Sequence, residues 1–243
     1  MRVVAIIQAR MCSSRLPGKV LLKVLGKPLL EYQLERVNRS KFIDEIVVAT
    51  TDQTIDDPIV TLCKNMEISY YRGSETDVLK RYYMAAIQTK ADVVVRLTSD
   101  CPLIDPAQID KVIESYFTCD HPLKYVSNTL IRTFPRGMDT EVFSFHALKE
   151  AYDKAELKVD REHVTRYMTN NDGVFKLLNV SNDKDFSHHR WTVDTQADFL
   201  LIKKIIGALY QQSSEFTLED IIQLLDKYPE WQMINHHIQQ KDE

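Results

Sequence analysis

The sequence lacks the features that mark several large classes of protein. Its four cysteines include no Cys-x-x-Cys pair, so neither a zinc site nor a disulfide framework is indicated and we expect reduced thiols. No apolar run reaches the roughly 18 residues of a membrane span, and the first residues do not read as a signal peptide. Low-complexity tracts and linker-like segments are missing too. We therefore expect a globular, cytoplasmic protein that has no membrane partner.

Charge is unevenly distributed. The formal net charge is -4, which argues against a general nucleic-acid binder, because such proteins usually carry an excess of basic residues on one face. Residues 1–30, however, contain no Asp or Glu and hold six basic residues: Arg2, Arg10, Arg15, Lys19, Lys23 and Lys27. An otherwise acidic chain thus begins with a cationic patch, which suits a small polyanion.

Hydrophobic periodicity predicts strands and helices in alternation. An apolar β-branched run at 3–9 precedes a loop and a helical pattern at 28–40. Further strands are expected at 45–50, 68–71 and 92–98, and helices at 58–66, 77–90 and 105–117. The strands are apolar on both faces, as when helices cover both sides of a mostly parallel sheet. The prediction is a doubly wound α/β fold.

The pattern becomes less regular after residue 120. Strands are expected at 123–128, 138–145 and 175–180 around a helix at 161–168, and helical patterns return from 194 to about 228. This part reads as a mixed-sheet extension. The whole chain, 1–243, is predicted to be a single domain.

The loop that follows the first strand combines cations with a turn. In open α/β sheets, ligands bind beyond the carboxyl ends of the strands, where this loop lies. Arg10, Arg15 and Lys19, with the small Ser13, could hold phosphates, and the Pro-Gly turn at 17–18 would fix the direction of Lys19. Neither GxxxxGK[ST] nor GxGxxG occurs. The alternative is a loop whose charges only keep it solvated.

Two carboxylates are candidates for a metal site. Asp100 directly follows the strand at 92–98, and one or two such carboxylates typically hold Mg²⁺. Asp194 precedes a helix. The alternative for each is a helix cap, Asp100 for the helix at 105–117 and Asp194 for the one after it. On sequence physics alone, the cap is the better reading of Asp194.

The opening segment also resembles a known family. Ala9-Arg10, Ser13, Arg15, Pro17-Gly18-Lys19 and the Gly-Lys-Pro-Leu at 26–29 are similar to the N-terminal signature of the cytidylyltransferases that activate acidic sugars, the CMP-KDO and acylneuraminate enzymes. The match is closest to the branch named for spore coat polysaccharide biosynthesis protein F. The resemblance implies a Rossmann-like fold of the nucleotide-diphospho-sugar transferase type, with a nucleotide-binding half at 1–120 and an acceptor-binding, possible dimer-contact half at 121–243.

The resemblance also implies site residues. Nucleotide contacts would come from Ala9, Arg10, Ser13, Arg15, Lys19, Gly73, Ser74, Asp77 and Ser99, with Arg10, Arg15, Lys19 and Asp100 acting in catalysis. Asp100 and Asp194 would hold Mg²⁺, the implied cofactor. Acceptor contacts would come from Arg136, Asp139, Glu141, Arg161, His163 and Arg190.

Some of these residues keep structural alternatives. Ser74 could cap a helix with Asp77 at its third position, and Asp139 and Glu141 could form one solvated face of a strand. His163 could act as a base, since the ordinary pKa of histidine is near neutral.

The function implied by the resemblance is transfer of CMP from CTP to a small anionic sugar acid, with release of pyrophosphate, in polysaccharide biosynthesis. The resemblance allows a homodimer and needs no nucleic-acid partner. Two alternatives stay open: a nucleotidyltransferase acting on a sugar or polyol phosphate, and a sugar-nucleotide-binding protein without catalytic activity.

Overall fold

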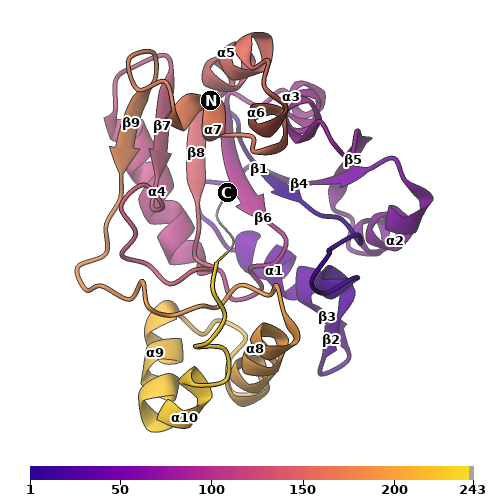
Figure 1. Cartoon of the computed structure of the whole chain (residues 1–243), viewed down its shortest axis with the longest axis vertical. Coiled ribbons are helices and arrows are strands. Elements are labelled where there is room, and N and C mark those ends of the chain that lie inside the picture. The colour runs from indigo at the N-terminus through magenta and orange to yellow at the C-terminus, as the bar shows by residue number, and fades with distance from the viewer. Residues whose placement is uncertain (241–243) are drawn as a thin grey trace.

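One mixed sheet forms the centre of the protein. A computed structural model describes residues 1–240, and within them seven strands join this sheet (Figure 1). Their order across it is β5 (Ser69–Gly73), β4 (Glu45–Thr51), β1 (Val3–Gln8), β6 (Val93–Thr98), β8 (Glu141–Ser144), β7 (Lys124–Ser127) and β9 (Lys176–Asn179). Strand β8 runs antiparallel to both neighbours, and the other pairs are parallel. The predicted mostly parallel sheet with a mixed extension is confirmed.

Helices cover both faces of the sheet. One layer contains α1 (Leu29–Val37), α2 (Asp57–Asn65) and α4 (Pro106–Thr118), and the other contains α3 (Val78–Thr89), α5 (Phe145–Lys154), α6 (Lys158–Glu162) and α7 (Arg166–Thr169). Successive side chains of β1 point to opposite faces. Ala5 and Ile7 therefore pack toward the first layer, and Val4 and Ile6 toward the second. Burial on both sides explains why the strands are apolar throughout.

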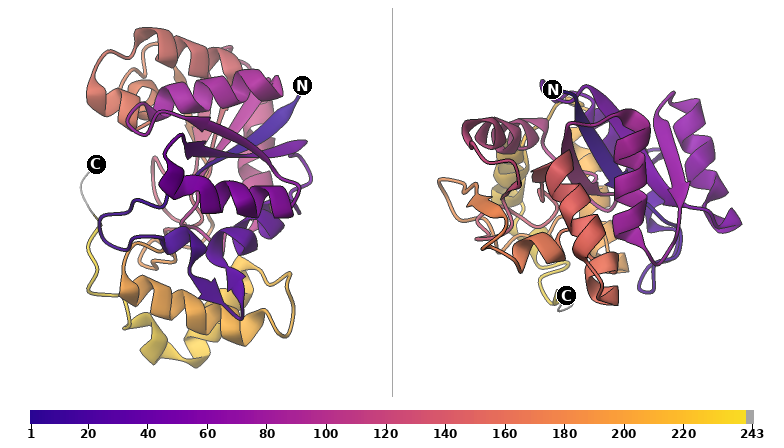
Figure 2. Two further views of the ribbon diagram at one scale, coloured as in Figure 1. Left: turned by 90° about the vertical axis from the view of Figure 1, so that its right-hand side faces the viewer. Right: turned by 90° about the horizontal axis from the view of Figure 1, so that it is seen from above.

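A third layer lies beyond the carboxyl ends of β1 and β6. It contains α8 (Gln196–Leu209), α9 (Leu218–Lys227) and α10 (Pro229–Gln232), with the hairpin of β2 (Lys23–Val24) and β3 (Lys27–Pro28) beside it (Figures 1 and 2). These elements share a separate apolar core that includes the fully buried Trp191. The loops that leave the sheet are thus enclosed between the strand ends and a helical layer. Two short 3-10 helices, η1 (Lys19–Leu21) and η2 (Thr54–Asp56), belong to those loops.

Two predicted elements are wrong in extent. The helix expected at 161–168 is divided into α6 and α7, because His163 leaves helical geometry and the Thr165 hydroxyl donates to the buried Glu141 carboxylate. The strand expected at 138–145 begins only at Glu141. Before it, Thr140 N donates to the Asn128 side chain instead of to a strand. Asp139 therefore precedes the strand, and the prediction that it shares a strand face with Glu141 is wrong.

The sheet joins both halves of the chain, since β6 pairs with β8. The division at residue 120 into a nucleotide half and an acceptor half stays a prediction. Among residues 1–240, no helix is both long enough and apolar enough to cross a membrane.

Candidate active site

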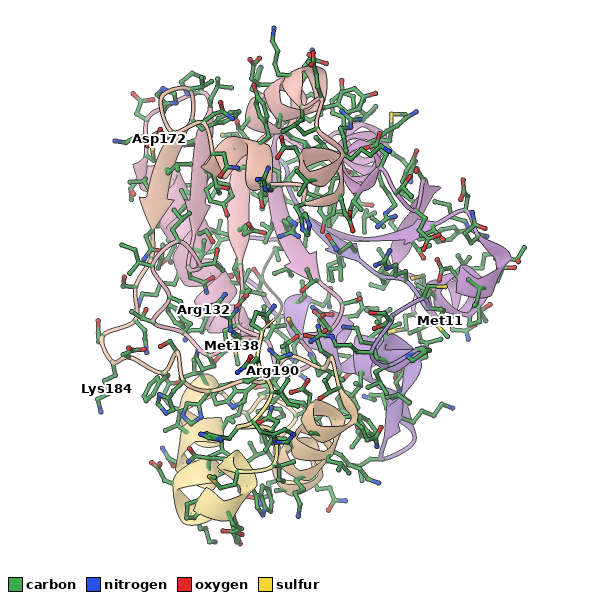
Figure 3. All side chains as sticks on the ribbon, viewed as in Figure 1. Met11, Arg132, Met138, Asp172, Lys184 and Arg190 are labelled. Carbon is green, nitrogen blue, oxygen red and sulfur yellow. The ribbon has the colours of Figure 1, made fainter. Side chains whose placement is uncertain are left out.

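The basic loop is closed at its base by backbone hydrogen bonds. Gly18 N and Ser13 N both donate to Met11 O, at 2.8 and 3.0 Å. Met11 N in turn donates to Asp56 Oδ1 at 2.6 Å, so the loop is attached to η2. Gly18 has a φ of +69°, the left-handed conformation that the Pro-Gly pair predicts. Lys19 follows as the first residue of η1, with its direction set by this turn. Met11, whose carbonyl accepts the two backbone hydrogen bonds, is labelled in Figure 3.

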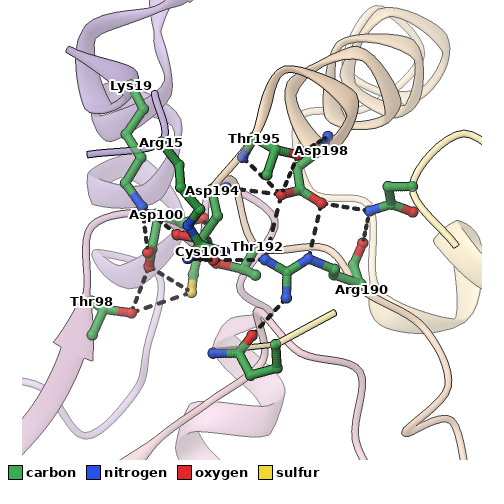
Figure 4. A network of polar contacts seen from close by, with 12 residues as sticks. Arg15, Lys19, Thr98, Asp100, Cys101, Arg190, Thr192, Asp194, Thr195 and Asp198 are labelled. Atoms are coloured by element: carbon green, nitrogen blue, oxygen red, sulfur yellow. Dashed lines mark hydrogen bonds and ion pairs between the residues drawn. The ribbon is translucent and has the colours of Figure 1, made fainter. Parts of the chain in front are cut away.

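Four charged side chains meet beyond the end of β6. Lys19 Nζ donates to Asp100 Oδ2 and to Asp194 Oδ1, both at 2.8 Å. Arg15 Nη2 lies 3.0 Å from Asp194 Oδ2. The side chain of Lys19 is only 12% exposed. Figure 4 shows the four residues converging from the loop, from the end of β6 and from the segment before α8.

Neither carboxylate is a helix cap. The N-cap of α4 is Asp105, which accepts from Ala107 N at 2.9 Å. The N-cap of α8 is Thr195, which forms a capping box with Asp198. The capping alternatives for Asp100 and Asp194 are therefore wrong, and both side chains are left to face the loop cations.

In each carboxylate, one oxygen accepts a hydrogen bond from a neighbouring side chain, and the other oxygen accepts from Lys19. Thr98 Oγ1 donates to Asp100 Oδ1 at 2.7 Å, and Arg190 Nη2 donates to Asp194 Oδ2 at 2.7 Å. The two segments are also joined through their backbones, because Val193 N donates to Asp100 O at 2.8 Å. Asp100 Oδ2 and Asp194 Oδ1 consequently face the same point, where the Lys19 ammonium lies.

The surroundings of Asp100 and Lys19 favour the charged form of each side chain. Burial by itself would raise the pKa of Asp100, but the Lys19 ammonium and the Thr98 hydroxyl outweigh it and lower that pKa below its ordinary value. Burial would likewise lower the pKa of Lys19, but Asp100 and Asp194 raise it. Both groups are therefore ionised at neutral pH.

The residues fit a magnesium ion that is bound together with a polyphosphate. Two carboxylate oxygens already converge on one cationic group, so the ammonium stands where a metal cation would be attracted. Among residues 1–240 no cluster of three or more His, Cys, Asp or Glu could hold a metal by itself. Mg²⁺ commonly takes only one or two carboxylates and completes its shell with phosphate oxygens and water. Asp100 and Asp194 match that requirement.

The other predicted nucleotide residues surround the strand ends. Arg10 is 47% exposed and points to Glu75, at 3.6 Å, instead of to the two carboxylates. Asp77 caps α3 by accepting from Lys80 N at 3.0 Å, while Ser74 Oγ accepts from Asp77 N at 3.1 Å. The predicted capping by Ser74 is therefore wrong, because the N-cap of α3 is Asp77, which had been expected at the third helical position.

The remaining three nucleotide candidates lie at the carboxyl ends of strands. Gly73 is the last residue of β5. Ala9 and Ser99 follow β1 and β6, and both are buried, with their backbone N–H groups donating to Ala49 O and Gln8 O at 3.1 Å.

The predicted acceptor residues do not form one cluster. Glu141 is buried and binds Arg96, Tyr125 and Thr165. Asp139 accepts two hydrogen bonds from Arg132, at 2.6 and 2.8 Å. Their roles as acceptor contacts stay predictions, and the acceptor would reach Glu141 only by entering a buried ion-pair network.

The other acceptor candidates are similarly engaged. Arg161 pairs with Asp77 at 2.7 Å, and His163 follows α6. Arg136 pairs through its backbone with Arg190, whose guanidinium binds Asp194 and Asp198. The acceptor roles of these residues stay predictions.

Several residues of this network were not found from the sequence. Thr98 orients Asp100, and Asp198 and Asn235 hold Arg190. The Thr-x-x-Asp spacing of a capping box could have indicated Asp198. Asn235 has no local signal, because its partners are 37 and 45 residues away.

Comparisons with known proteins identify the family of the chain. The cytidylyltransferase family model matches residues 4–236. The chain is similar to the spore coat polysaccharide biosynthesis protein SpsF of Bacillus subtilis, at 33% identity over 94% of this chain and 95% of that protein. A solved structure of a cytidylyltransferase from Leptospira borgpetersenii has a TM-score of 0.91 at 36% identity, with 100% of both chains covered.

A more distant solved structure shares the fold. It is CMP:2-keto-3-deoxy-manno-octonic acid synthetase in complex with CTP, with a TM-score of 0.63 at 19% identity. It covers 85% of this chain and 99% of that one.

Proposed function

Since the chain belongs to the cytidylyltransferase family, and is thus a nucleotidyltransferase enzyme, we propose that it transfers CMP from CTP to a sugar acid and releases pyrophosphate. We further propose that the product serves polysaccharide biosynthesis in the cytoplasm. The observation that carries the proposal is the position of Lys19, whose ammonium lies between Asp100 and Asp194 at 2.8 Å from each. A cation site beside a basic loop is the arrangement that a metal-bound triphosphate requires.

The reaction needs charge neutralisation more than covalent chemistry. A hydroxyl oxygen of the acceptor attacks the α-phosphorus of CTP, a new P–O bond forms, and the bond to the β-phosphate oxygen breaks. The hydroxyl proton leaves, and pyrophosphate carries away the electron pair. Arg10, Arg15 and Lys19 would offset the charge of the triphosphate and of the departing pyrophosphate. Mg²⁺, held by Asp100 and Asp194, would supply further charge neutralisation at the phosphates.

Two similar proteins support a sugar acid as the acceptor. The SpsF similarity extends over nearly the whole chain, and the synthetase with the same fold is named for an acidic keto sugar. A sugar acid also agrees with the basic residues assigned to the acceptor side, Arg136 and Arg161. The choice of CTP rests on the family to which the chain belongs.

Calorimetry tests the proposal without knowledge of the acceptor. CTP, UTP, ATP and GTP are titrated into wild-type protein and the Asp100→Ala variant, each with and without Mg²⁺. We expect selective CTP binding that Mg²⁺ strengthens in the wild type only. Asp183→Ala is the matched control, since it removes an exposed carboxylate from the loop before Arg190.

Turnover is then measured as pyrophosphate release with a panel of sugar acids and sugar phosphates, with product masses determined. A sugar acid gives a monophosphate-linked product, and a sugar phosphate a diphosphate-linked one. Absence of CTP binding by folded wild-type protein would overturn the proposal.

A further inference from the structure

A buried network of charged side chains contacts Asp194. Arg190 is 8% exposed, and its guanidinium is shared between two carboxylates. Nη2 donates to Asp194 Oδ2 at 2.7 Å, and Nε donates to Asp198 Oδ1 at 3.0 Å. Because Arg15 approaches the same Oδ2, that oxygen is fully engaged by cations. Only Oδ1 of Asp194 is presented toward Asp100 and Lys19.

Asp198 connects this pair to the start of α8. Its Oδ2 accepts from Asp194 N at 3.0 Å and from Thr195 N at 2.9 Å. Burial would raise the pKa of Asp198, but hydrogen bonds from Asn235 and Arg190 lower it, so the carboxylate stays charged. Asp194 is thereby held twice, through its backbone by Asp198 and through its side chain by Arg190.

The C-terminal segment completes the network. Asn235 is 4% exposed, and its Nδ2 donates both to Asp198 Oδ1 at 2.8 Å and to Arg190 O at 2.9 Å. Gln240 Oε1 accepts from Arg190 Nη1 at 2.6 Å. All three nitrogens of the guanidinium are thus fixed, two of them by carboxylates and the third by the tail.

We propose that Asn235 and Gln240 are positioning residues that act through Arg190 to aim Asp194 Oδ1 at the divalent cation. The inference rests on the proposed function, since it concerns the cation bound with CTP. The physical reason is the directionality of the guanidinium. Its planar donors are held by Asp198, which accepts from Nε and Nη2 at 3.0 and 3.4 Å, so Nη2 is fixed where it donates to Asp194 Oδ2. Two amides, 45 and 50 residues further along the chain, hold this arrangement: Asn235 through the Arg190 carbonyl and Asp198, and Gln240 through Arg190 Nη1.

A purely structural role would give a different result. Loss of a buried amide destabilises the fold wherever it occurs, whereas loss of positioning also weakens the binding of the cation. Partners that orient metal-binding carboxylates typically contribute 10-fold to 100-fold to metal affinity. The two roles are therefore separated by measuring metal affinity and stability in the same variants.

The experiment measures Mn²⁺ affinity by electron paramagnetic resonance, with CTP present, together with the midpoint of thermal unfolding. Asn235→Asp removes the donating amide nitrogen at nearly constant volume. Asn128→Asp is the matched control, because Asn128 is 1% exposed and its side chain binds only Met138 O and Thr140 N. We expect both variants to melt earlier, and Asn235→Asp alone to bind Mn²⁺ roughly tenfold more weakly.

Gln240→Ala provides a second variant that leaves the core intact, and a smaller loss of Mn²⁺ affinity is expected. It decides the question if Asn235→Asp does not fold. Unchanged Mn²⁺ affinity in Gln240→Ala and in any folded Asn235→Asp, with a wild type that does bind Mn²⁺ and CTP together, would overturn this inference alone. A wild type without metal-dependent CTP binding would overturn the proposed function and this inference with it.

Discussion

The ammonium of Lys19 lies 2.8 Å from Asp194 Oδ1, although 175 residues separate the two in sequence. The same ammonium lies 2.8 Å from Asp100 Oδ2. A side chain of the basic loop thus lies between the two carboxylates to which the proposed function assigns a metal cation. Binding of a metal and CTP would transfer the ammonium from the carboxylates to the phosphates, at little electrostatic cost because one cation replaces another.

Lys19→Met tests this exchange. Without the competing ammonium, we expect nucleotide-free protein to bind Mn²⁺ more tightly, because Asp100 Oδ2 and Asp194 Oδ1 then face the same point with no cation between them. Turnover should nonetheless fall by about 10²–10³-fold, since a cation at the phosphates is lost. Mn²⁺ titration and pyrophosphate release measure the two effects. Lys23→Met, at an exposed position in the neighbouring hairpin, should change neither, and weaker metal binding in Lys19→Met would contradict the exchange.

Thr98→Val should remove a hydrogen bond that orients the Asp100 carboxylate. Its hydroxyl donates to Asp100 Oδ1 at 2.7 Å, and a hydrogen bond to a charged group contributes about 1.5–3 kcal/mol. The hydroxyl also helps lower the pKa of Asp100. Stability from this lowered pKa is present above about pH 4 and lost as pH falls through the folded-state value. Urea unfolding at neutral pH should show the loss in Thr98→Val, and Thr98→Ser should restore most of it.

Gly137→Ala should destabilise the segment that carries Arg190. Gly137 has a φ of +105°, and a Cβ there would lie 2.7 Å from the carbonyl carbon of Trp191. We expect a loss of about 2–3 kcal/mol from backbone strain and overpacking. Gly207→Ala is the control, because an added Cβ at this position, near the C-terminal end of α8, meets no atom within 4 Å apart from the neighbouring backbone of the helix. It should raise stability by about 0.5–1 kcal/mol. Equal unfolding midpoints for the two variants would contradict the close approach.

His189 should make stability depend on pH. The ring lies between those of His188 and Trp191, at centroid distances of 4.1 and 5.3 Å. Burial, and then the neighbouring His188, lower its pKa to about 4. The unfolded chain therefore binds more protons than the folded one between about pH 4 and pH 6.5, and stability rises with pH over that window.

The measurement is the difference in free energy of unfolding between wild type and His189→Gln across that window. The difference should increase with pH by at most about 1.4 kcal/mol per unit. His237→Gln, at an exposed position, should show no such trend. A wild-type curve parallel to that of His189→Gln would mean that His189 titrates normally.

The fold and the location of the site were predictable from local patterns. Successive side chains of a strand face opposite layers, so a strand that is covered on both sides is apolar throughout, and the apolar run at 3–9 identified β1. The end of that run located the basic loop. The Pro-Gly pair predicted the turn that directs Lys19, and Gly18 adopts it. Such features depend on residues a few positions apart, which a sequence displays directly.

What each charged group does was decided by contacts between distant segments. By sequence, Asp100 was a candidate cap for α4, and only the structure shows that Asp105 caps this helix while Asp100 contacts Lys19. Arg190 was predicted as an acceptor contact, and only the structure shows that its guanidinium binds Asp194 and Asp198.

The sequence by itself therefore determined the sheet, the loop and the presence of two carboxylates. The tertiary structure decided which oxygen of each carboxylate faces Lys19 and that the C-terminal segment hydrogen-bonds to Arg190 and Asp198. The physical reason is that a hydrogen bond such as that from Asn235 to Asp198, across 37 residues, leaves no periodic or local signature in the chain.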